Sequence, residues 1–249
     1  MANLDPKTVY DRDGFYVARG VFTPAEAQTL REHFMRRRAE GPKPGDLGGN
    51  PKSGEKDPLN AYPRMINMHP WDETTNTLWQ DPRLKDLAAK LVGDAVELKQ
   101  TMLYFKPPGG RGQGLHQDCQ YIQQKPLIGV WVALDDCDAA NGQMVVVPGS
   151  HKLGLQEVTS ADESKSFVGG QTVLPEGCRE AGVPMAAGDV LFFDGFTIHG
   201  SYNNTTADRF RRSFIVHYVG AHAEKLVADE KKHMSYVRKQ VLEKQKVGA

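Results

Sequence analysis

The sequence predicts a mainly β fold with flanking helices, arranged as a sandwich or a barrel. From about residue 95 onward, short apolar runs alternate with turns rich in Gly and Pro, a pattern typical of all-β folds. One run, residues 127–134, is almost entirely apolar, as expected for a strand that is buried on both faces. Helical patterns precede this region, and no linker divides the strands into two sets. We therefore expect one domain over residues 1–249.

Within that domain we expect a β core at about residues 95–219, N-terminal helices and a lid in residues 1–94, and a C-terminal helix in residues 223–247. Two polar stretches, residues 40–63 and 152–184, show no apolar periodicity and are predicted to be long loops. Long loops in compact domains are usually functional lids or disordered segments. We interpret these two stretches as candidate lids.

The elements before the core are predicted from their caps and apolar spacing. Residues 6–22 are expected to form a short helix and then a strand. Thr23 and Glu26 have the spacing of a capping box, so a helix should begin there and run to about residue 39. Residues 82–91 carry leucines at helical spacing and are predicted to be a further helix. The core strands are predicted at residues 96–105, 115–122, 127–134, 144–147, 190–193, 198–202 and 211–219.

The composition argues against several classes of protein. Lys plus Arg and Asp plus Glu number 31 each, so no charge excess suggests nucleic acid or an anionic membrane surface as a partner. Three cysteines at wide spacing form neither a disulfide framework nor a CxxC metal motif, and they fit a reducing compartment. The first residues lack the apolar segment of a signal peptide, and no apolar run approaches the length of a membrane span. We therefore expect a cytoplasmic protein.

The stretch His116-Gln117-Asp118 carries the strongest chemical signal. Residues i and i+2 of a strand point to the same face, so this imidazole and carboxylate are expected to project into the same space. His199 follows a later apolar strand and precedes a glycine, which allows the backbone to approach a ligand closely. Two His and one carboxylate with open positions opposite are typical of non-haem Fe(II) oxygenases. Taken singly, each of these histidines is also explained as a structural residue, and His217 in the last predicted strand is a candidate for burial.

Arginines at the start of the last predicted strand provide a second signal. A 2-oxo acid that chelates iron needs a fixed partner for its far carboxylate, and a guanidinium fork is the best one. Arg211 and Ser213 share a strand face, so the hydroxyl can add a donor beside the guanidinium. Arg209 shares that face nearer the loop and stays an open alternative. Ordinary strand-edge charges would explain the same arginines without any ligand.

Several short motifs follow one another in a fixed order along the chain. They are Met102-Leu103-Tyr104-Phe105-Lys106-Pro107, His116-Gln117-Asp118, Gly129-Val130-Trp131-Val132-Ala133-Leu134, Asn141-Gly142, Val147-Pro148-Gly149-Ser150-His151, Gly188-Asp189-Val190, His199-Gly200-Ser201, and Arg211 with Ser213. In this order they resemble the phytanoyl-CoA dioxygenase family of Fe(II)- and 2-oxoglutarate-dependent oxygenases, from about residue 12 to residue 219. The resemblance implies a double-stranded β-helix, the jelly roll also found in cupins.

The resemblance also implies roles for matching positions. His116, Asp118 and His199 would bind Fe(II), and Arg211 would pair with the far carboxylate of 2-oxoglutarate, with Ser213 beside it. Four further residues would line the 2-oxoglutarate pocket, namely Met102, Tyr104, Trp131 and Ser201. The segment from His199 to Arg211 is one residue longer than in several members, which keeps Arg209 open. The parts before residue 95 and at residues 152–184 match the family little and are expected to contact the substrate.

The reaction implied by the resemblance consumes O₂ and converts 2-oxoglutarate to succinate and CO₂ while an unactivated C–H of a small molecule is oxidised. Relatives that halogenate have a small residue in place of the carboxylate. Because Asp118 is present, we expect hydroxylation, or desaturation or ring formation, and not halogenation. The substrate stays open between a natural-product intermediate, which we favour, and an acyl thioester.

Other interpretations remain at this stage. A cupin-like metal enzyme would use the same metal ligands without a keto acid, and would not need Arg211. A non-catalytic module could bind a small molecule on the same fold. A structural zinc site is the least favoured, because such sites prefer four ligands rich in Cys.

Overall fold

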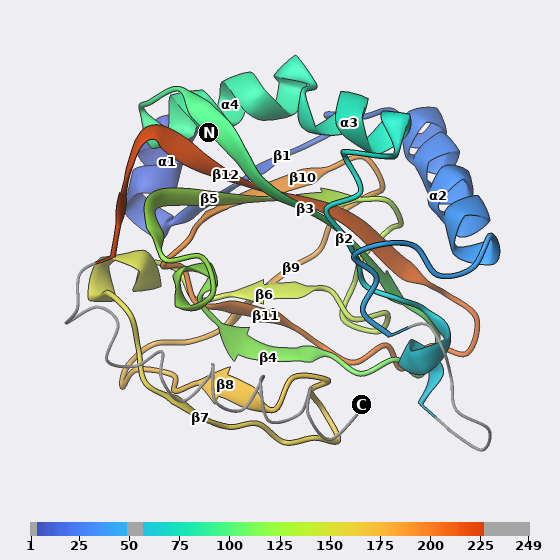
Figure 1. Ribbon diagram of the computed structural model, residues 1–249. Helices are drawn as coiled ribbons and strands as arrows, with labels where there is room; N and C mark the ends of the chain where they lie inside the picture. Colours follow the sequence, from blue (N-terminus) through green and yellow to red (C-terminus); the bar gives the residue numbers. More distant parts are fainter. Residues whose placement is uncertain (1–3, 49–56, 227–249) are drawn as a thin grey trace.

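Two antiparallel sheets form the core of the computed structural model, which describes residues 4–48 and 57–226 (Figure 1). In the described residues, the larger sheet has the order β1 (Phe15–Ala18), β10 (Val190–Asp194), β5 (Gln124–Ala133), β12 (Arg211–Lys225), β3 (Val96–Lys106) and β2 (Met65–Ile66). The smaller sheet has the order β4 (Gln113–His116), β11 (His199–Ser201), β6 (Met144–Val146) and β9 (Ala181–Val183). Strands β7 (Val158–Ser160) and β8 (Gly170–Thr172) pair separately. Two facing sheets with crossing connections give the predicted jelly roll.

Helices cover the outer face of the larger sheet (Figure 1). They are α1 (Pro6–Asp13), α2 (Pro24–Ala39), α3 (Glu73–Trp79) and α4 (Pro82–Val92), and single 3₁₀ turns occur at Pro58–Ala61, Asp118–Gln120 and Ser150–Leu153. The predicted capping box is present, since Thr23 and Glu26 satisfy each other's backbone N–H at the start of α2. None of the helices within the described ranges is long and apolar enough to cross a bilayer.

Side chains alternate between two apolar layers along the central strands. On β5, Val130 and Val132 pack under the helices, whereas Trp131 and Ala133 point between the two sheets. The same period on β12 sends Phe214, Val216 and Tyr218 to the helices. The intervening positions therefore face the interior of the jelly roll, which is where chemistry-bearing side chains of β12 must lie.

Three predictions about the periphery are wrong or incomplete. The stretch 152–184 is not wholly irregular, because it contains β7, β8 and β9. These strands are three residues long, too short for an apolar period. Strands β7 and β8 pair with each other, and β9 pairs with β6 outside the stretch.

The predicted C-terminal helix at 223–247 does not begin where expected. Strand β12 continues to Lys225, with Glu224 and Lys225 opposite Lys125 and Gln124 of β5. Sheet pairing therefore overrides the local charged pattern, and residues 227–249 lie outside the described residues. Helix α3 was not predicted from the sequence. Of the predicted loop 40–63, residues 49–56 also lie outside the described residues, and its described end forms a 3₁₀ turn at Pro58–Ala61.

Candidate metal and co-substrate site

The three predicted metal ligands converge in the interior of the jelly roll. His116 ends β4 and His199 begins β11, and the two residues are direct partners across the strands. Asp118 Oδ1 lies 3.8 Å from His116 Nε2 and 3.7 Å from His199 Nε2. All three side chains are buried, and one potential ligand atom from each lies within 4.8 Å of the others. Within the described residues they are the group of His, Cys, Asp and Glu side chains able to hold a metal.

Asp118 reaches this point by a route that differs from the prediction. The expected strand 115–122 ends at His116, and Asp118 begins a 3₁₀ turn. Gln117 sets the turn, because its buried amide donates to the carbonyls of Gly154 and Phe196 and accepts from the N–H of Gln156. The prediction that His116 and Asp118 converge is therefore correct, but the reason given for it, a shared strand face, is wrong.

Both histidines present the nitrogen that a metal requires. His116 Nδ1 lies 2.9 Å from the carbonyl of Gly114, and His199 Nδ1 lies 3.0 Å from that of Thr197. Each Nδ1–H can therefore donate to the backbone, which leaves the Nε2 lone pair facing inward. Burial is the main cause that lowers the pKa of both imidazoles, to about 3 for His116, and it favours the neutral form that metal binding demands. The side-chain amide nitrogen Nε2 of Gln113 lies 3.0 Å from His116 Nε2, at the position that a metal ion bound to this nitrogen would take.

The carboxylate is held in its charged form. Burial alone would raise the pKa of Asp118, but the imidazoles of His217 and His199 outweigh burial and lower it well below its usual range. His217 Nε2 lies 2.8 Å from Asp118 Oδ2. One anionic oxygen and two neutral imidazole nitrogens match the donor set that Fe(II) takes in oxygenases.

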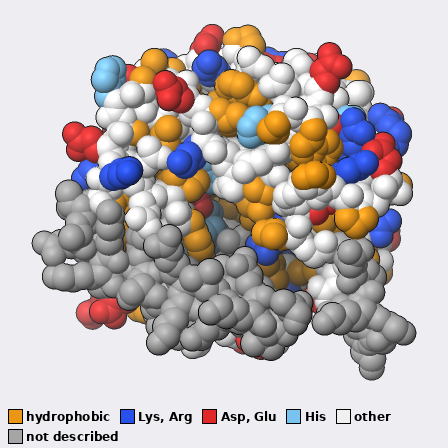
Figure 2. Space-filling model, viewed as in Figure 1, with side chains coloured by type: hydrophobic (Ala, Val, Ile, Leu, Met, Phe, Trp, Pro, Cys, Tyr) orange, Lys and Arg blue, Asp and Glu red, His pale blue; other side chains and the backbone are white. Residues whose placement is uncertain are grey.

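The site opens into a cavity of about 480 Å³. On the face shown in Figure 2 the molecule is hollowed near its centre, and hydrophobic side chains border the hollow. Of the predicted co-substrate residues, Met102, Tyr104, Trp131, Ser201 and Arg211 line the cavity with the three metal ligands. A cavity of this size is typical of small-molecule sites.

Arg211 is a buried cation that the described part of the protein does not neutralise. It is 2% exposed, and no ion pair to it is found in the described residues. Its Nη1 donates to Ser213 Oγ at 2.9 Å, and its guanidinium lies 5.2 Å from the centre of the Trp131 ring. Nε has no hydrogen-bond partner, and burial lowers the pKa of Arg211. A buried, partly unpaired guanidinium is costly, and an anionic ligand would compensate it.

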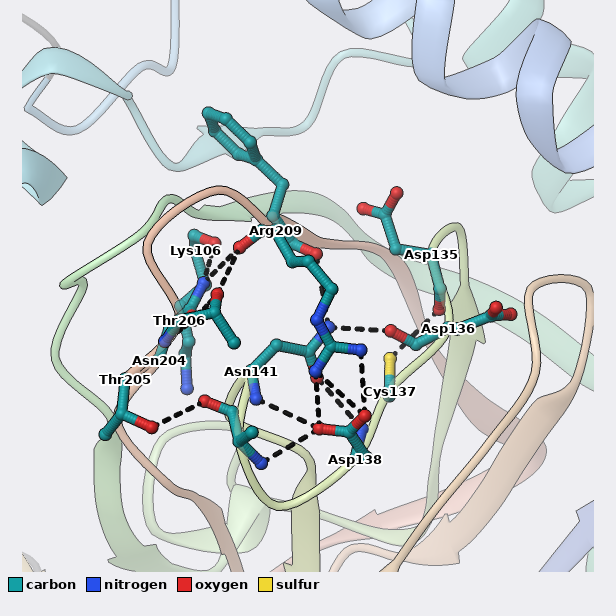
Figure 3. A network of polar contacts seen from close by, with 12 residues as sticks. Lys106, Asp135, Asp136, Cys137, Asp138, Asn141, Asn204, Thr205, Thr206 and Arg209 are labelled. Atoms are coloured by element: carbon teal, nitrogen blue, oxygen red, sulfur yellow. Dashed lines mark hydrogen bonds and ion pairs between the residues drawn. The ribbon is translucent and has the colours of Figure 1, made fainter.

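The alternative arginine is used elsewhere. Arg209 makes a two-pronged ion pair with Asp138, 2.7 and 2.8 Å long, at the surface beside the Asn141-Gly142 turn (Figure 3). It is not among the residues that line the cavity. Ser213 does not line the cavity either, and its contact is with Arg211.

Ser201 is held by a buried lysine. Lys106 Nζ lies 2.8 Å from Ser201 Oγ, donates to the carbonyl of Tyr202, and lies 3.4 Å from the carbonyl of Gly142. The N–H of Gln113 also donates to Ser201 Oγ, at 3.2 Å. With both lone pairs of the hydroxyl engaged, its own hydrogen is free to donate into the cavity. Burial, and then the neighbouring Arg211, lower the pKa of Lys106 well below its usual value.

Replacing Lys106 by Met should destabilise the protein by ~1–3 kcal/mol, because the carbonyls of Tyr202 and Gly142 lose this donor, and Ser201 Oγ loses one of two, while the apolar stem is kept. Urea unfolding measures the change. Lys99→Met, an exposed position on the same strand, is the matched control and should stay within ~0.5 kcal/mol of the unsubstituted chain. Equal stability of the two variants would contradict a structural role for the Lys106 contacts.

Sequence reasoning missed several residues that contact the cavity. Gln113, Tyr121 and His217 lie near the metal ligands, Phe167 comes from the predicted loop 152–184, and Arg64 directly follows the predicted loop 40–63. His217 could have been found, because it is six residues after Arg211 and shares its strand face. Gln113 begins β4, before the predicted start of that strand at residue 115, and the other three are brought in by turns and irregular segments, which carry no period. Gly200, which was expected to approach a ligand, lines the cavity, and a Cβ there would also meet the carbonyl of Gln113 at 2.8 Å, so glycine also permits the close packing of β11 on β4.

Comparison with known proteins decides the family. The family model for phytanoyl-CoA dioxygenase (PhyH) matches residues 10–213. The chain belongs to the phytanoyl-CoA dioxygenase family. Peroxisomal phytanoyl-CoA dioxygenase of Bos taurus is 26% identical over 237 residues, covering 88% of this chain and 69% of the relative. Ectoine dioxygenase of Nocardia farcinica is 26% identical over 219 residues, covering 80% and 72%.

Solved structures confirm the fold. The epimerase SnoN in complex with Fe³⁺, α-ketoglutarate and nogalamycin RO has a TM-score of 0.70 at 24% identity, covering 89% of this chain and 85% of SnoN. EvdO2 from Micromonospora carbonacea var. aurantiaca complexed with 2-oxoglutarate has a TM-score of 0.68 at 21% identity, covering 92% and 95%. The PhyH-family chain thus has the double-stranded β-helix that the sequence predicted.

Proposed function

We propose that this PhyH-family dioxygenase hydroxylates an unactivated C–H of a small molecule, coupled to conversion of 2-oxoglutarate and O₂ to succinate and CO₂. Membership of the family makes the chain an Fe(II)- and 2-oxoglutarate-dependent oxygenase. The observation that carries the residue assignment is the proximity of the three ligand atoms of His116, Asp118 and His199 in a cavity that also contains Arg211, a buried cation with no ion pair in the described residues.

The protein's own residues divide the work in this proposal. His116, Asp118 and His199 hold Fe(II), and Arg211 pairs with the far carboxylate of 2-oxoglutarate while Ser213 orients the guanidinium. Ser201 offers its hydroxyl hydrogen to the same co-substrate, and Met102, Tyr104 and Trp131 form apolar walls. When bound, iron and 2-oxoglutarate together supply the oxidant through decarboxylation of the keto acid. The enclosed walls keep the target C–H close and limit access of water.

We propose a small or medium-sized substrate, a natural-product intermediate rather than an intact acyl thioester. The cavity volume of about 480 Å³ supports this size. Its walls combine aromatic rings of Tyr104, Tyr121 and Phe167 with the guanidinium of Arg64, which lies 5.1 Å from the Phe167 ring. Such a lining fits a largely apolar molecule with a polar or anionic group. For the compartment we propose the cytoplasm, with which the lack of disulfide bonds at Cys119, Cys137 and Cys178 in the described residues is consistent.

The alternative is a cupin-like metal enzyme that uses no keto acid. Under that alternative the buried Arg211 has no ligand to neutralise it, which makes it the less favoured function. A non-catalytic binding module would likewise leave the metal-ligand set without a use.

Succinate formation tests the proposal. The purified protein is incubated with Fe(II), 2-oxoglutarate and O₂, with and without members of a panel of amino-acid derivatives, acyl thioesters and natural-product intermediates. We expect succinate release to rise with a true substrate, and isotopically labelled O₂ to place one oxygen atom in the product. Binding of a panel compound without any 2-oxoglutarate consumption would favour the binding module, and oxidation that does not require 2-oxoglutarate would favour the cupin-like enzyme.

A further inference from the structure

The contact between His217 and Asp118 joins the two sheets at the metal site. His217 lies on β12 between its partners Gly129 of β5 and Gln100 of β3, in the middle of the larger sheet. Asp118 follows β4 of the smaller sheet. His217 Nε2 and Asp118 Oδ2 are 2.8 Å apart, and both side chains are buried. A hydrogen bond this short between buried groups is well placed to fix the orientation of the carboxylate.

The two oxygens of Asp118 have different surroundings. Oδ1 faces the Nε2 atoms of His116 and His199, at 3.8 and 3.7 Å, whereas Oδ2 faces His217. Within the described residues, no other side chain donates to the carboxylate of Asp118. The geometry therefore assigns Oδ1 of Asp118 to a metal and Oδ2 to the hydrogen bond with His217.

This division determines how many metal positions stay open. A carboxylate that binds through one oxygen leaves three of six positions vacant beside two histidines, enough for a chelating keto acid and O₂. A carboxylate that binds through both oxygens would take one of those positions. A donor fixed on Oδ2 opposes the second arrangement.

The cost of burying His217 indicates that its place depends on this contact. Its Nδ1 is buried and has no hydrogen-bond partner. A buried nitrogen without a partner destabilises a protein, and an apolar residue would avoid that cost on the interior face of β12. We propose that His217 is a positioning residue that holds Asp118 as a one-oxygen metal ligand. This proposal rests on the proposed function, since it concerns the same metal site.

Binding of Co(II) alone, in place of Fe(II) and without 2-oxoglutarate, tests the role of His217. We expect His217→Leu to weaken Co(II) binding by ~10–100-fold, the usual effect of removing a group that orients a metal ligand. The visible absorption of bound Co(II), which reports coordination geometry, should change as well. His217→Gln, whose amide nitrogen can take the place of Nε2, should restore most of the affinity and the spectrum of the unsubstituted protein.

The matched control is a partly buried His–Asp contact away from the cavity. His33 Nε2 lies 2.9 Å from Asp72 Oδ2, and neither residue lines the cavity. His33→Leu removes the same kind of contact and should leave Co(II) affinity and spectrum unchanged. If His217→Leu does not fold, His217→Asn replaces it in the comparison with His217→Gln, because the shorter amide cannot reach Oδ2.

The outcomes separate this inference from the proposed function. Tight Co(II) binding by the unsubstituted protein, together with an unchanged affinity and spectrum in His217→Leu, would overturn the positioning role and leave the metal site intact. Equal Co(II) affinity in His217→Asn and His217→Gln would overturn it too. Failure of the unsubstituted protein to bind Co(II) would instead overturn the proposed function, and this inference with it.

Discussion

Replacing Arg211 by Met is expected to abolish stabilisation of the protein by 2-oxoglutarate without destabilising the ligand-free protein. A charged hydrogen-bonded partner of a buried carboxylate is worth ~2–5 kcal/mol, so the dissociation constant should rise roughly 30-fold to several thousand-fold. In the ligand-free protein, Met removes a buried cation that has no ion-pair partner in the described residues, a change that is often neutral or stabilising. Thermal unfolding with Mn(II), with and without 2-oxoglutarate, measures both effects.

Arg209→Met is the matched control for this prediction. Arg209 is two residues away on the chain, but its guanidinium pairs with Asp138 at the surface. The control should retain the full thermal shift with 2-oxoglutarate. Arg211→Lys should be intermediate, because an ammonium keeps the charge and loses the planar fork. Loss of the shift in Arg209→Met and its retention in Arg211→Met would reverse the assignment, and retention in both would favour the enzyme without a keto acid.

The β core was predictable because its signals are local. The apolar run at 127–134 became β5 and its continuation, buried throughout, as a strand between a helix layer and a second sheet must be. The shared face of Arg211 and Ser213 also followed from the two-residue period, and the structure places their side chains in contact. Extending the same count to His217 would have found the third interior group of β12.

Other parts of the site were not predictable, because they depend on contacts distant in sequence. The turn that presents Asp118 is set by the amide of Gln117, whose partners Gly154 and Phe196 lie in other segments. Arg64 and Phe167 meet at the cavity although about a hundred positions separate them. A pattern confined to one segment contains no information about such pairs. The sequence therefore predicted that the parts before residue 95 and at 152–184 contact the substrate, but not which of their residues form the cavity wall.

The two histidine ligands, His116 and His199, combine features that were predictable from the sequence with features that were not. Their identity as ligands came from residue type and order, and their direct pairing across β4 and β11 came only from the structure. The fixed tautomers, with Nδ1 against the carbonyls of Gly114 and Thr197, depend on backbone positions two residues before each histidine. In both cases the backbone conformation just before the histidine sets the contact of Nδ1 with the carbonyl two residues earlier. Predicting this contact from the sequence would require the ends of β4 and β11 to be predicted to the exact residue.

Replacing Asp118 by Ala is expected to reduce substrate-stimulated succinate formation to background. The variant removes the single anionic ligand and leaves two neutral imidazoles, so Fe(II) affinity should fall by more than ~100-fold, beyond the effect of losing an orienting neighbour. It also removes the acceptor of His217. Anaerobic Fe(II) binding and succinate release measure the two consequences, and circular dichroism checks that the variant is folded.

Formate distinguishes a lost ligand from a damaged fold. The cavity left by Asp118→Ala is the size of the removed carboxylate and is flanked by His116, His199 and His217, so added formate should enter it and restore part of the Fe(II) binding. Asp162→Ala, an exposed position in the 152–184 stretch, is the control and should bind Fe(II) and release succinate normally without formate. Normal succinate release by Asp118→Ala with a true substrate would refute the assignment of Asp118 as a metal ligand. Formate returns only the carboxylate and not the turn that presents it. A folded variant that formate does not rescue would therefore place the defect in the surrounding turn.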